Sequence, residues 1–256
     1  MRPDPYSWSA HPDAALGLVL LVVAYAAAAY RFRPRRARVA AFAAAVVLLA
    51  ATAFTPLHAL QFHVLVAHLL QNVILAEWAP ALLVLAVPPA LAARAGGLRA
   101  FRALTRPAVA LPLWLLVYFA WHLPPAYDAA LRNPDTLLHL EHASYLVAGV
   151  LLWWPALQDA PWRLSLQARA TYLFVAFLFC SPIGLLFALL PDAVYETYAE
   201  GFPEWSLTAL ADQQIAGIVM ASAQAVVFFG AFAYFFLRFL GQEERGPHPR
   251  AAPPGT

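Results

Sequence analysis

Lysine is absent from this 256-residue sequence, and sulfur-containing residues are scarce, with one cysteine and two methionines. The missing lysine excludes a retinal protein of the usual form, because its chromophore is attached to a lysine as a Schiff base. The single cysteine, Cys180, cannot form a disulfide within the chain, so cysteine usage says nothing about the redox compartment. Cys180 lies inside an apolar run, where a cysteine is usually a small buried hydrophobe.

Charge is also scarce. Only 12% of the residues are charged and 62% are hydrophobic, whereas a soluble domain is about 25% charged. The composition therefore predicts a membrane protein. The basic residues are all arginine and form no stripe on a soluble domain, so no nucleic-acid partner is expected. The N-terminal segment MRPDPYSWSAHPD lacks the pattern of a cleaved signal peptide, and the first apolar run is expected to stay as an anchor.

The long apolar runs predict an all-α membrane protein, a bundle of seven transmembrane helices. Each run approaches the roughly 20 residues needed to cross a bilayer. The predicted spans lie near 13–30, 39–57, 62–90, 107–122, 136–157, 170–190 and 207–240. Residues 1–12 are then an extracytoplasmic N-terminal segment, 13–240 the transmembrane domain, and 241–256 a disordered cytoplasmic tail.

The arginines predict the orientation of the bundle, because cytoplasmic loops carry the excess of basic residues. Every second link is basic, whereas the alternate segments hold only Arg2 and Arg132. This pattern predicts an N-terminus outside and a C-terminus in the cytoplasm. The arginines of the basic segments are Arg31, Arg33, Arg35, Arg36, Arg38, Arg94, Arg99, Arg102, Arg106, Arg163, Arg169, Arg238, Arg245 and Arg250.

With this topology, six of the eight histidines fall at or just below the outer membrane surface, and only His11 and His248 belong to the polar ends. His139 and His142 are three residues apart and share a helix face, and Asp212 begins the last span at a similar depth. Imidazoles from facing helices can hold copper, zinc, iron or nickel. The six are His58, His63, His68, His122, His139 and His142.

Structural explanations compete with a metal site. Histidine rings at helix ends often lie in the headgroup zone. For His58, His63 and His122, this explanation weighs as much as a role as metal ligand. Asp212 could cap the last span instead of serving a ligand. For His142 and Asp212, which lie below the surface, function is favoured, because buried ionisable groups are costly in a membrane. Glu141 could support the histidines or face headgroups.

Four ordered motifs make the sequence, from about residue 62 to 225, resemble the CtaG family of cytochrome c oxidase assembly factors, bacterial membrane proteins implicated in delivering copper to the oxidase. Two positions depart from the family pattern: Asn72 stands where a second histidine is common, and Ala221 follows Met220 where tryptophan is usual. The motifs are H-x-x-Q at His68 to Gln71, W-H-x-P-x-x-Y at Trp121 to Tyr127, L-H-L-E-H with G-x-L-x-W-W-P at Leu138 to Pro155, and D-Q-x-x-x-G-x-x-M at Asp212 to Met220.

The resemblance implies a multi-pass protein of the bacterial cell membrane that is not an enzyme and that supports delivery of copper to the oxidase. Its implied partners are the oxidase subunit with a copper centre and the lipid bilayer, with a homodimer left open. Either Cu(I) or Cu(II) would suit imidazole ligands, with zinc as the alternative, although two methionines are too few for a methionine-lined Cu(I) channel. The expected ligands, on the extracytoplasmic side, are His68, His122, His139 and His142, with Asp212 as ligand or orienting group and His63 as a first ligand on the way in.

Two other classes stay open on sequence grounds. A seven-helix membrane metallohydrolase would also gather histidines and an aspartate at one leaflet, with zinc activating a water molecule. A haem or quinone redox protein could use paired histidines on facing helices, but the histidines crowd one leaflet, which disfavours two haems stacked across the membrane. A transporter would need more polar residues across the spans than Glu77 provides.

Overall fold

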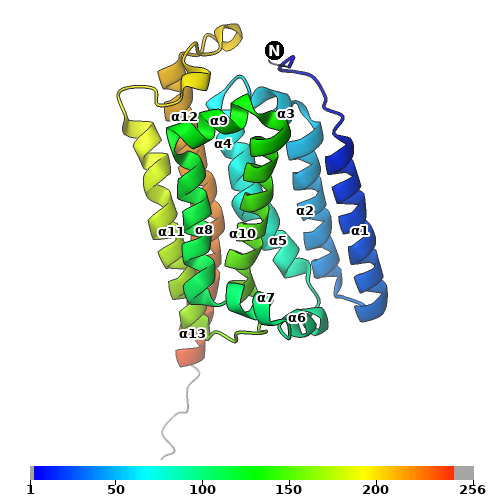
Figure 1. Ribbon diagram of the computed structural model, residues 1–256. Coiled ribbons are helices and arrows are strands. Elements are labelled where there is room, and N and C mark those ends of the chain that lie inside the picture. The colour runs from blue at the N-terminus through cyan, green and yellow to red at the C-terminus, as the bar shows by residue number, and fades with distance from the viewer. Residues whose placement is uncertain (1–2, 245–256) are drawn as a thin grey trace, which may run out of the picture.

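The chain folds into a bundle of helices that run nearly parallel (Figure 1), as seen in a computed structural model that describes residues 3–244. Within these residues there is no strand, and one isolated antiparallel bridge joins Phe202 to Leu207. The described chain begins at the upper end of the bundle, and the last helix ends at the lower end. The prediction of an all-helical protein is confirmed.

The helices include three π-helical turns, η1, η2 and η5, and two short 3-10 turns, η3 and η4. In chain order they are α1 (Pro12–Phe32), α2 (Arg36–Phe54), α3 (Pro56–Leu60), α4 (Leu65–Val73), η1 (Ile74–Trp78), α5 (Ala79–Ala86), α6 (Pro89–Ala95), α7 (Arg99–Leu104), α8 (Pro107–His122), α9 (Pro124–Arg132), η2 (Pro134–Leu138), α10 (His139–Leu157), α11 (Leu166–Leu189), η3 (Glu196–Tyr198), η4 (Pro203–Trp205), α12 (Ala209–Gln224), η5 (Ala225–Phe229) and α13 (Gly230–Glu243).

Five helical segments within residues 3–244 are long and apolar enough to cross a membrane, and a sixth is reached if α8 and α9, bent by 73°, count as one broken span. These lengths and compositions identify a multi-pass membrane protein. The count of seven transmembrane helices stays a prediction, because a seventh span would have to be α10, which is not among these segments. Residues 241–243 of the predicted tail belong to α13, and residues 245–256 lie outside the described part. The five segments are Pro12–Phe32, Arg36–Phe54, Leu65–Ala86, Leu166–Leu189 and Ala209–Glu243.

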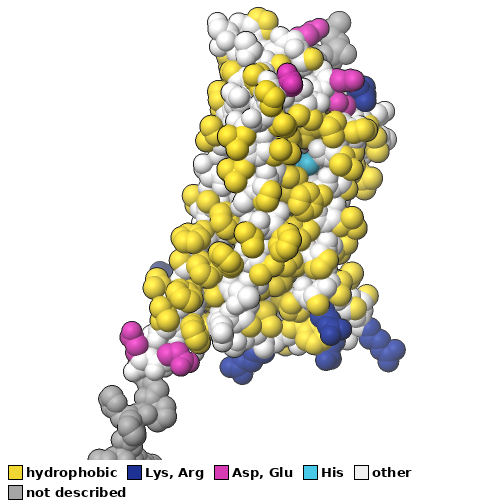
Figure 2. All heavy atoms as spheres, turned by 90° about the vertical axis from the view of Figure 1, so that its left-hand side faces the viewer, with side chains coloured by type: hydrophobic (Ala, Val, Ile, Leu, Met, Phe, Trp, Pro, Cys, Tyr) yellow, Lys and Arg dark blue, Asp and Glu magenta, His cyan; other side chains and the backbone are white. Residues whose placement is uncertain are grey.

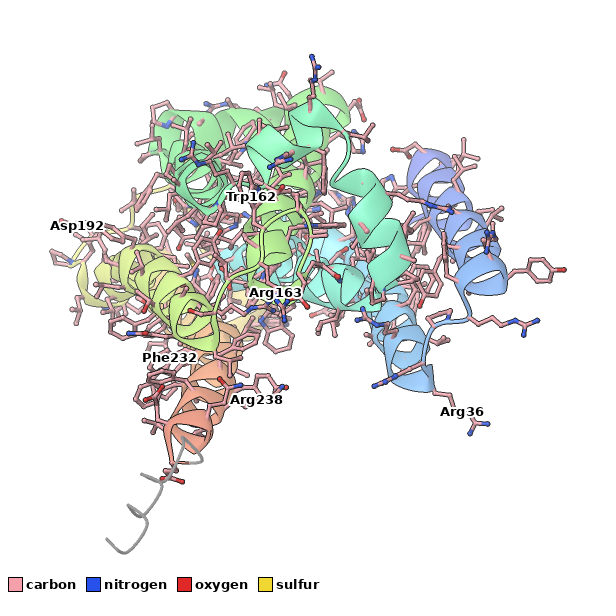
Figure 3. All side chains as sticks on the ribbon, turned by 90° about the horizontal axis from the view of Figure 1, so that it is seen from below. Arg36, Trp162, Arg163, Asp192, Phe232 and Arg238 are labelled. Atoms are coloured by element: carbon pink, nitrogen blue, oxygen red, sulfur yellow. The ribbon has the colours of Figure 1, made fainter. Side chains whose placement is uncertain are left out.

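Most described arginines gather at the lower end of the bundle, where Figure 2 shows them as a dark blue rim. Figure 3, seen from below, places Arg36, Arg163 and Arg238 there. The chain thus separates an arginine-rich end from an end that carries α3, α9 and the loop before α12. That this lower end faces the cytoplasm stays a prediction from the loop charges.

Local chemistry explains several helix starts. The Thr208 and Ser165 hydroxyls accept hydrogen bonds from the N–H groups of Ala211, at 3.2 Å, and Ala168, at 3.1 Å, so each satisfies a backbone donor in the first turn. By contrast, α4 begins after Val64, whose side chain cannot cap. Its first donors must therefore find an acceptor elsewhere in the fold.

Close helix contacts place α10 in the interior of the bundle, where it packs against α8, α5 and η1. A Cβ atom at Gly149 of α10 would lie 2.3 Å from the backbone oxygen of Ala76, so this contact requires glycine. Gly217 on α12 similarly faces Gly184 on α11, where an added Cβ would lie 2.4 Å from the Gly184 oxygen. These contacts hold α10 against η1 and α12 against α11.

Candidate functional site

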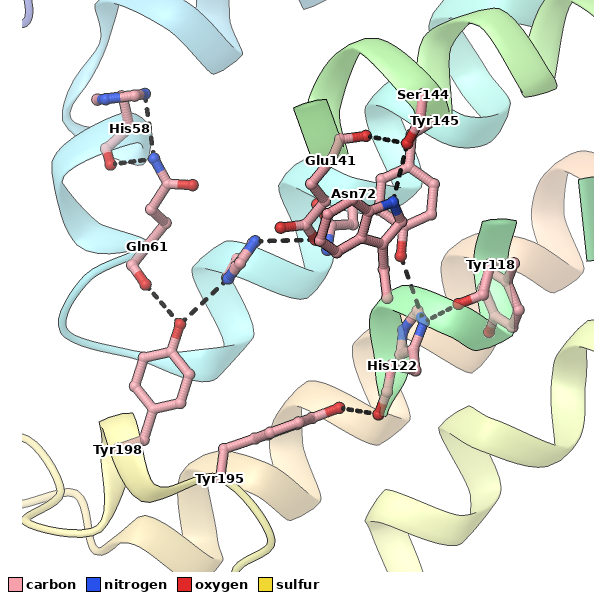
Figure 4. Close-up of polar contacts among 12 residues, drawn as sticks. His58, Gln61, Asn72, Tyr118, His122, Glu141, Ser144, Tyr145, Tyr195 and Tyr198 are labelled. Carbon is pink, nitrogen blue, oxygen red and sulfur yellow. Dashed lines mark hydrogen bonds and ion pairs between the residues drawn. The ribbon is translucent and has the colours of Figure 1, made fainter. Parts of the chain in front are cut away.

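A buried polar cluster joins α4 and α10 near the upper end of the bundle. The His68 and Glu141 side chains are fully buried, with His68 Nε2 3.4 Å from Glu141 Oε1. Asn72, one turn below His68, donates from Nδ2 to the same carboxylate oxygen at 2.9 Å. Figure 4 shows Asn72 beneath Glu141. A buried carboxylate on the bundle axis, rather than one facing headgroups, is therefore the centre of this cluster.

Hydrogen-bond donors fix the proton on the His68 ring. The Tyr198 hydroxyl donates to the backbone oxygen of Gln61 at 2.5 Å, so its own oxygen is left to accept from His68 Nδ1 at 3.3 Å. In the neutral ring, Nδ1 then carries the hydrogen and Nε2 has a bare lone pair. That lone pair faces a carboxylate oxygen, and a positive species, either a proton or a metal ion, is needed between the two acceptors.

His142 lies beside this cluster, one helix turn after Leu138. Its ring centre is 6.2 Å from that of His68, and its Nε2 is buried without a hydrogen-bond partner. His142 also lines a cavity of about 420 Å³ between α1, α2 and α10, whose wall is mostly aliphatic. The cavity therefore connects the edge of the buried cluster with the outer surface of the bundle.

Three histidines near the upper end of the bundle line the cavity, His11, His58 and His139. The sequence did not predict His11 and His58 as ligands. His11 and His58 meet ring to ring, with centroids 4.3 Å apart, and His139 lies 3.4 Å from Asp13 through Nε2 and Oδ2. Burial, with repulsion from His11 and His139 next, lowers the pKa of the His58 imidazole to about 4. The His58 ring is therefore neutral at neutral pH, and its Nδ1 accepts a hydrogen bond from Gln61 Nε2 at 3.1 Å.

Three of the predicted residues lie apart from the buried cluster. The His139 side chain is 48% exposed, although His139 shares a helix face with His142. The His63 Nε2 is 2.7 Å from the backbone oxygen of Pro3, and its ring packs on Phe202. Asp212 accepts from the N–H groups of the first two residues of α4, at 2.5 and 3.0 Å. It therefore caps α4 rather than its own helix.

His122, the last residue of α8, has a buried ring. Its Nδ1 donates to the backbone oxygen of Tyr118 at 2.7 Å, and the Tyr145 hydroxyl lies 3.3 Å from the same nitrogen. Figure 4 shows both contacts on the side of Glu141 opposite to Tyr198. Its Nε2 is buried without a partner. The His122 ring is thus held in one tautomer, with a free lone pair on Nε2.

Replacing Asp212 by alanine is expected to lower the free energy of unfolding by about 0.5–2 kcal/mol, the usual cost of losing a helix cap, because two N–H donors of α4 lose their acceptor. Thermal denaturation in detergent measures the loss. Asp192→Ala, at an exposed position of the upper loop, is the matched control. A variant that keeps wild-type stability but loses bound metal would instead identify Asp212 as a ligand.

The described residues do not form a completed metal site. Among residues 3–244, no group of three or more His, Cys, Asp and Glu side chains has the arrangement to hold a metal ion. The donor chemistry nevertheless suits one, because His68, His122 and His142 each have an unpaired buried Nε2. A buried polar atom normally has a partner, so these three nitrogens are candidates for a ligand role.

Some residues of the cluster carry no sequence signal of their own. Tyr198 lies in the loop before α12 and reaches His68 across 130 positions of sequence, which no local pattern predicts. His58 was visible at the outer surface by topology, but His11 was grouped with the polar N-terminal end. Glu141 was visible from its position inside L-H-L-E-H, next to His142.

The sequence profile of the cytochrome c oxidase caa3 assembly factor family (Caa3_CtaG) matches residues 23–242, most of the bundle. The chain belongs to this family. Membership confirms the resemblance seen in the motifs and gives a role in assembly of cytochrome c oxidase. This caa3 assembly factor family does not favour a metallohydrolase or a haem or quinone protein.

Comparisons with curated proteins and with solved structures found no match for this caa3 assembly factor family member. The matched region includes the buried cluster and His122, but it begins inside α1. His11 and Asp13, which line the cavity, lie before it. The cluster therefore belongs to the family region, whereas part of the cavity lining does not.

Proposed function

We propose that this chain assists assembly of cytochrome c oxidase by binding a copper ion at His68, His142 and Glu141 and passing it to the oxidase subunit that carries a copper centre. One observation supports this most directly: the bare Nε2 of His68 faces a carboxylate oxygen across 3.4 Å. Two acceptors at this distance repel unless a proton or a metal ion lies between them. Copper favours imidazole ligands.

The distances within the cluster suit a shared ion. Two imidazoles that bind one ion at about 2.0–2.1 Å per nitrogen have ring centres roughly 5–6 Å apart. The ring centres of His68 and His142 are 6.2 Å apart, so a small movement of His142 would complete a set of two nitrogens and a carboxylate. A set of nitrogen and oxygen donors is typical of Cu(II). Zinc would accept the same donors, and we keep it as the alternative ion.

The cavity supplies a path to this site. His11, His58, His139 and His142 line the cavity, and the His139 side chain is 48% exposed, so an ion would meet an accessible imidazole before it reaches the cluster. We place the cavity opening on the extracytoplasmic side, since α3, which contains His58, and the start of α1, next to His11, are at the end of the bundle away from the arginines (Figure 1, Figure 2). Delivery requires weak, exchangeable coordination, which an incomplete ligand set provides.

Metal analysis tests the proposal. Purified protein equilibrated with Cu(II) and washed is expected to keep copper with nitrogen couplings in its electron paramagnetic resonance spectrum, whereas His68→Ala and His142→Ala lose that signal. His63→Ala is the matched control, because His63 contacts Pro3 and lies outside the cluster. Wild type that stays free of copper, or a His68→Ala, His142→Ala double variant that keeps the signal, would show the proposed site to be wrong.

Complementation tests the role in the cell separately. In a strain that lacks this chain, oxidase activity is expected to return with wild type and with His63→Ala, but not with the double variant. Full activity with the double variant would separate assembly from copper binding at this cluster.

A further inference from the structure

A second group of unpaired acceptors surrounds a narrow void below the buried cluster. The void contains about 180 Å³ of empty space between α4, η1, α8, α10 and α12, and it is nowhere wide enough for a water molecule. Among its lining residues are Asn72, Glu77, His122 and Met220. Glu77 follows His68 by nine residues, about 14 Å along a helix at 1.5 Å per residue. The void therefore extends deeper than the buried cluster of His68 and Glu141, hereafter the outer cluster, and Asn72 borders both.

Three of these side chains have an acceptor atom without a partner. Asn72 uses Nδ2 on Glu141, which leaves Oδ1 unpaired, and Glu77 accepts from Gln224 with Oε1, at 2.8 Å, which leaves Oε2 unpaired. His122 has its hydrogen on Nδ1, so Nε2 holds a lone pair. All three residues are more than nine-tenths buried. Unpaired buried acceptors are costly, and this void gathers three of them.

Most hydrogen-bond donors around the void are already used. The Tyr118 hydroxyl donates to the backbone oxygen of Cys180 at 3.1 Å and accepts from Gln224. Among the lining residues, the donors left are the Tyr145 hydroxyl, which lies against Nδ1 of His122, and the second Nδ2 hydrogen of Asn72. A buried water would normally satisfy such acceptors, but the void is too narrow for one. A cation that binds without its water shell would satisfy these acceptors and fit the void.

The backbone around the void is also unusual. Glu77 lies in the π-helical turn η1, and Gln224, which holds it, directly precedes the π-helical turn η5. Such turns are rare and occur often at functional sites. Two of them on facing helices position one carboxylate and its amide partner. This placement is independent of the unpaired acceptors and indicates the same location.

We propose that the void binds a bare Cu(I) ion through His122 Nε2 and the Met220 thioether, with Glu77 and Asn72 providing oxygen contacts and the neutralising charge. The identification of the ion as copper rests on the proposed function. A thioether and an imidazole are soft donors that select Cu(I). A strongly hydrated ion such as Mg²⁺ would keep several waters, for which there is no room. One carboxylate balances one positive charge, so the ion can be buried.

X-ray absorption of protein loaded with a cuprous acetonitrile complex without oxygen tests this site. Wild type is expected to show one sulfur neighbour at copper, and Met220→Leu, which keeps a similar shape, is expected to lose that neighbour and the ion. Cys180→Ser is the matched control, because Cys180 is a buried sulfur on α11 that does not line the void. It should keep the wild-type spectrum.

The results separate this site from the outer cluster. Loss of the Cu(II) signal in His68→Ala with retention of the sulfur-bound Cu(I) supports the inner site alone. Loss of both ions in His68→Ala, or a sulfur neighbour that persists in Met220→Leu, overturns it. Folding is checked by helix content, so a variant that fails to fold is replaced by Met220→Ile. An infrared band of a protonated Glu77 carboxyl in copper-loaded wild type, absent in Glu77→Gln, would identify a proton as the occupant and also overturn the proposal.

Discussion

Glu141→Gln is expected to remove copper from the outer cluster while leaving the metal-free protein as stable as wild type or more stable. Glutamine has nearly the same shape as glutamate. Its amide oxygen can accept from Asn72 as the Glu141 carboxylate does at 2.9 Å. The same oxygen position faces His68 Nε2 at 3.4 Å, so glutamine places a neutral oxygen there instead of a charged one. The substitution thus removes the negative charge that repels the His68 lone pair in the metal-free protein.

The loss of copper should be large. Altering a group that supports a metal ligand typically lowers affinity by about 10- to 100-fold, and here the altered group is itself a proposed ligand. Equilibrium dialysis against Cu(II), read by paramagnetic resonance, measures the affinity, and thermal denaturation without metal measures the stability. Wild-type affinity in Glu141→Gln would rule out Glu141 as a ligand.

Two controls separate charge from packing. Glu141→Ala leaves the Asn72 amide without its acceptor, and an unsatisfied buried group costs about 1–3 kcal/mol, so this variant should be less stable than Glu141→Gln. Glu77→Gln changes another buried carboxylate, which lies in η1 and accepts from Gln224, and should leave the Cu(II) signal unchanged. The opposite order of stabilities would mean that Glu141 acts mainly as the charged partner of a protonated His68.

The helical class could be predicted from the sequence, because long apolar runs are a local pattern. Pairing across helices was harder to predict. His139 and His142 share a face by spacing, yet His139 begins α10 after η2 and is half exposed, while His142 is one turn deeper. One turn of helix at a membrane surface decides between solvent and core, and spacing alone cannot place that boundary.

Partners contributed by distant loops were not predictable. Tyr198 orients the His68 proton from the loop before α12, and Asp212 caps α4 across 147 positions. The sequence offered Asp212 as a helix cap, and its carboxylate does accept from backbone N–H groups, but those groups belong to α4 rather than to its own helix. A side chain that accepts from the backbone of another helix gives no signal in its own segment. The uncapped N–H groups follow Val64, at the start of α4, far in sequence from Asp212. The sequence singled out Asn72 only because it stands where the family commonly has a second histidine.

Gly149→Ala is expected to destabilise the bundle and to weaken the cluster that depends on it. The added Cβ would lie 2.3 Å from the Ala76 oxygen and 2.6 Å from Pro80 Cγ. Pro80 has no N–H to donate to that oxygen, which instead accepts from the Trp114 indole at 3.2 Å. The methyl group must therefore displace backbone, and the displacement disturbs the contact with α8 as well.

Overpacking of this kind costs typically about 1–3 kcal/mol, and the weakened Trp114 hydrogen bond adds about 1 kcal/mol. Thermal unfolding followed by tryptophan fluorescence measures the change. Gly230→Ala is the matched control, since a Cβ there meets nothing within 4 Å. Gly149 lies two helix turns from Glu141, so separating α10 from η1 should also lengthen the Asn72 to Glu141 contact and lower copper affinity. A Gly149→Ala protein with wild-type melting and wild-type copper binding would mean that the helices can part here without moving the site.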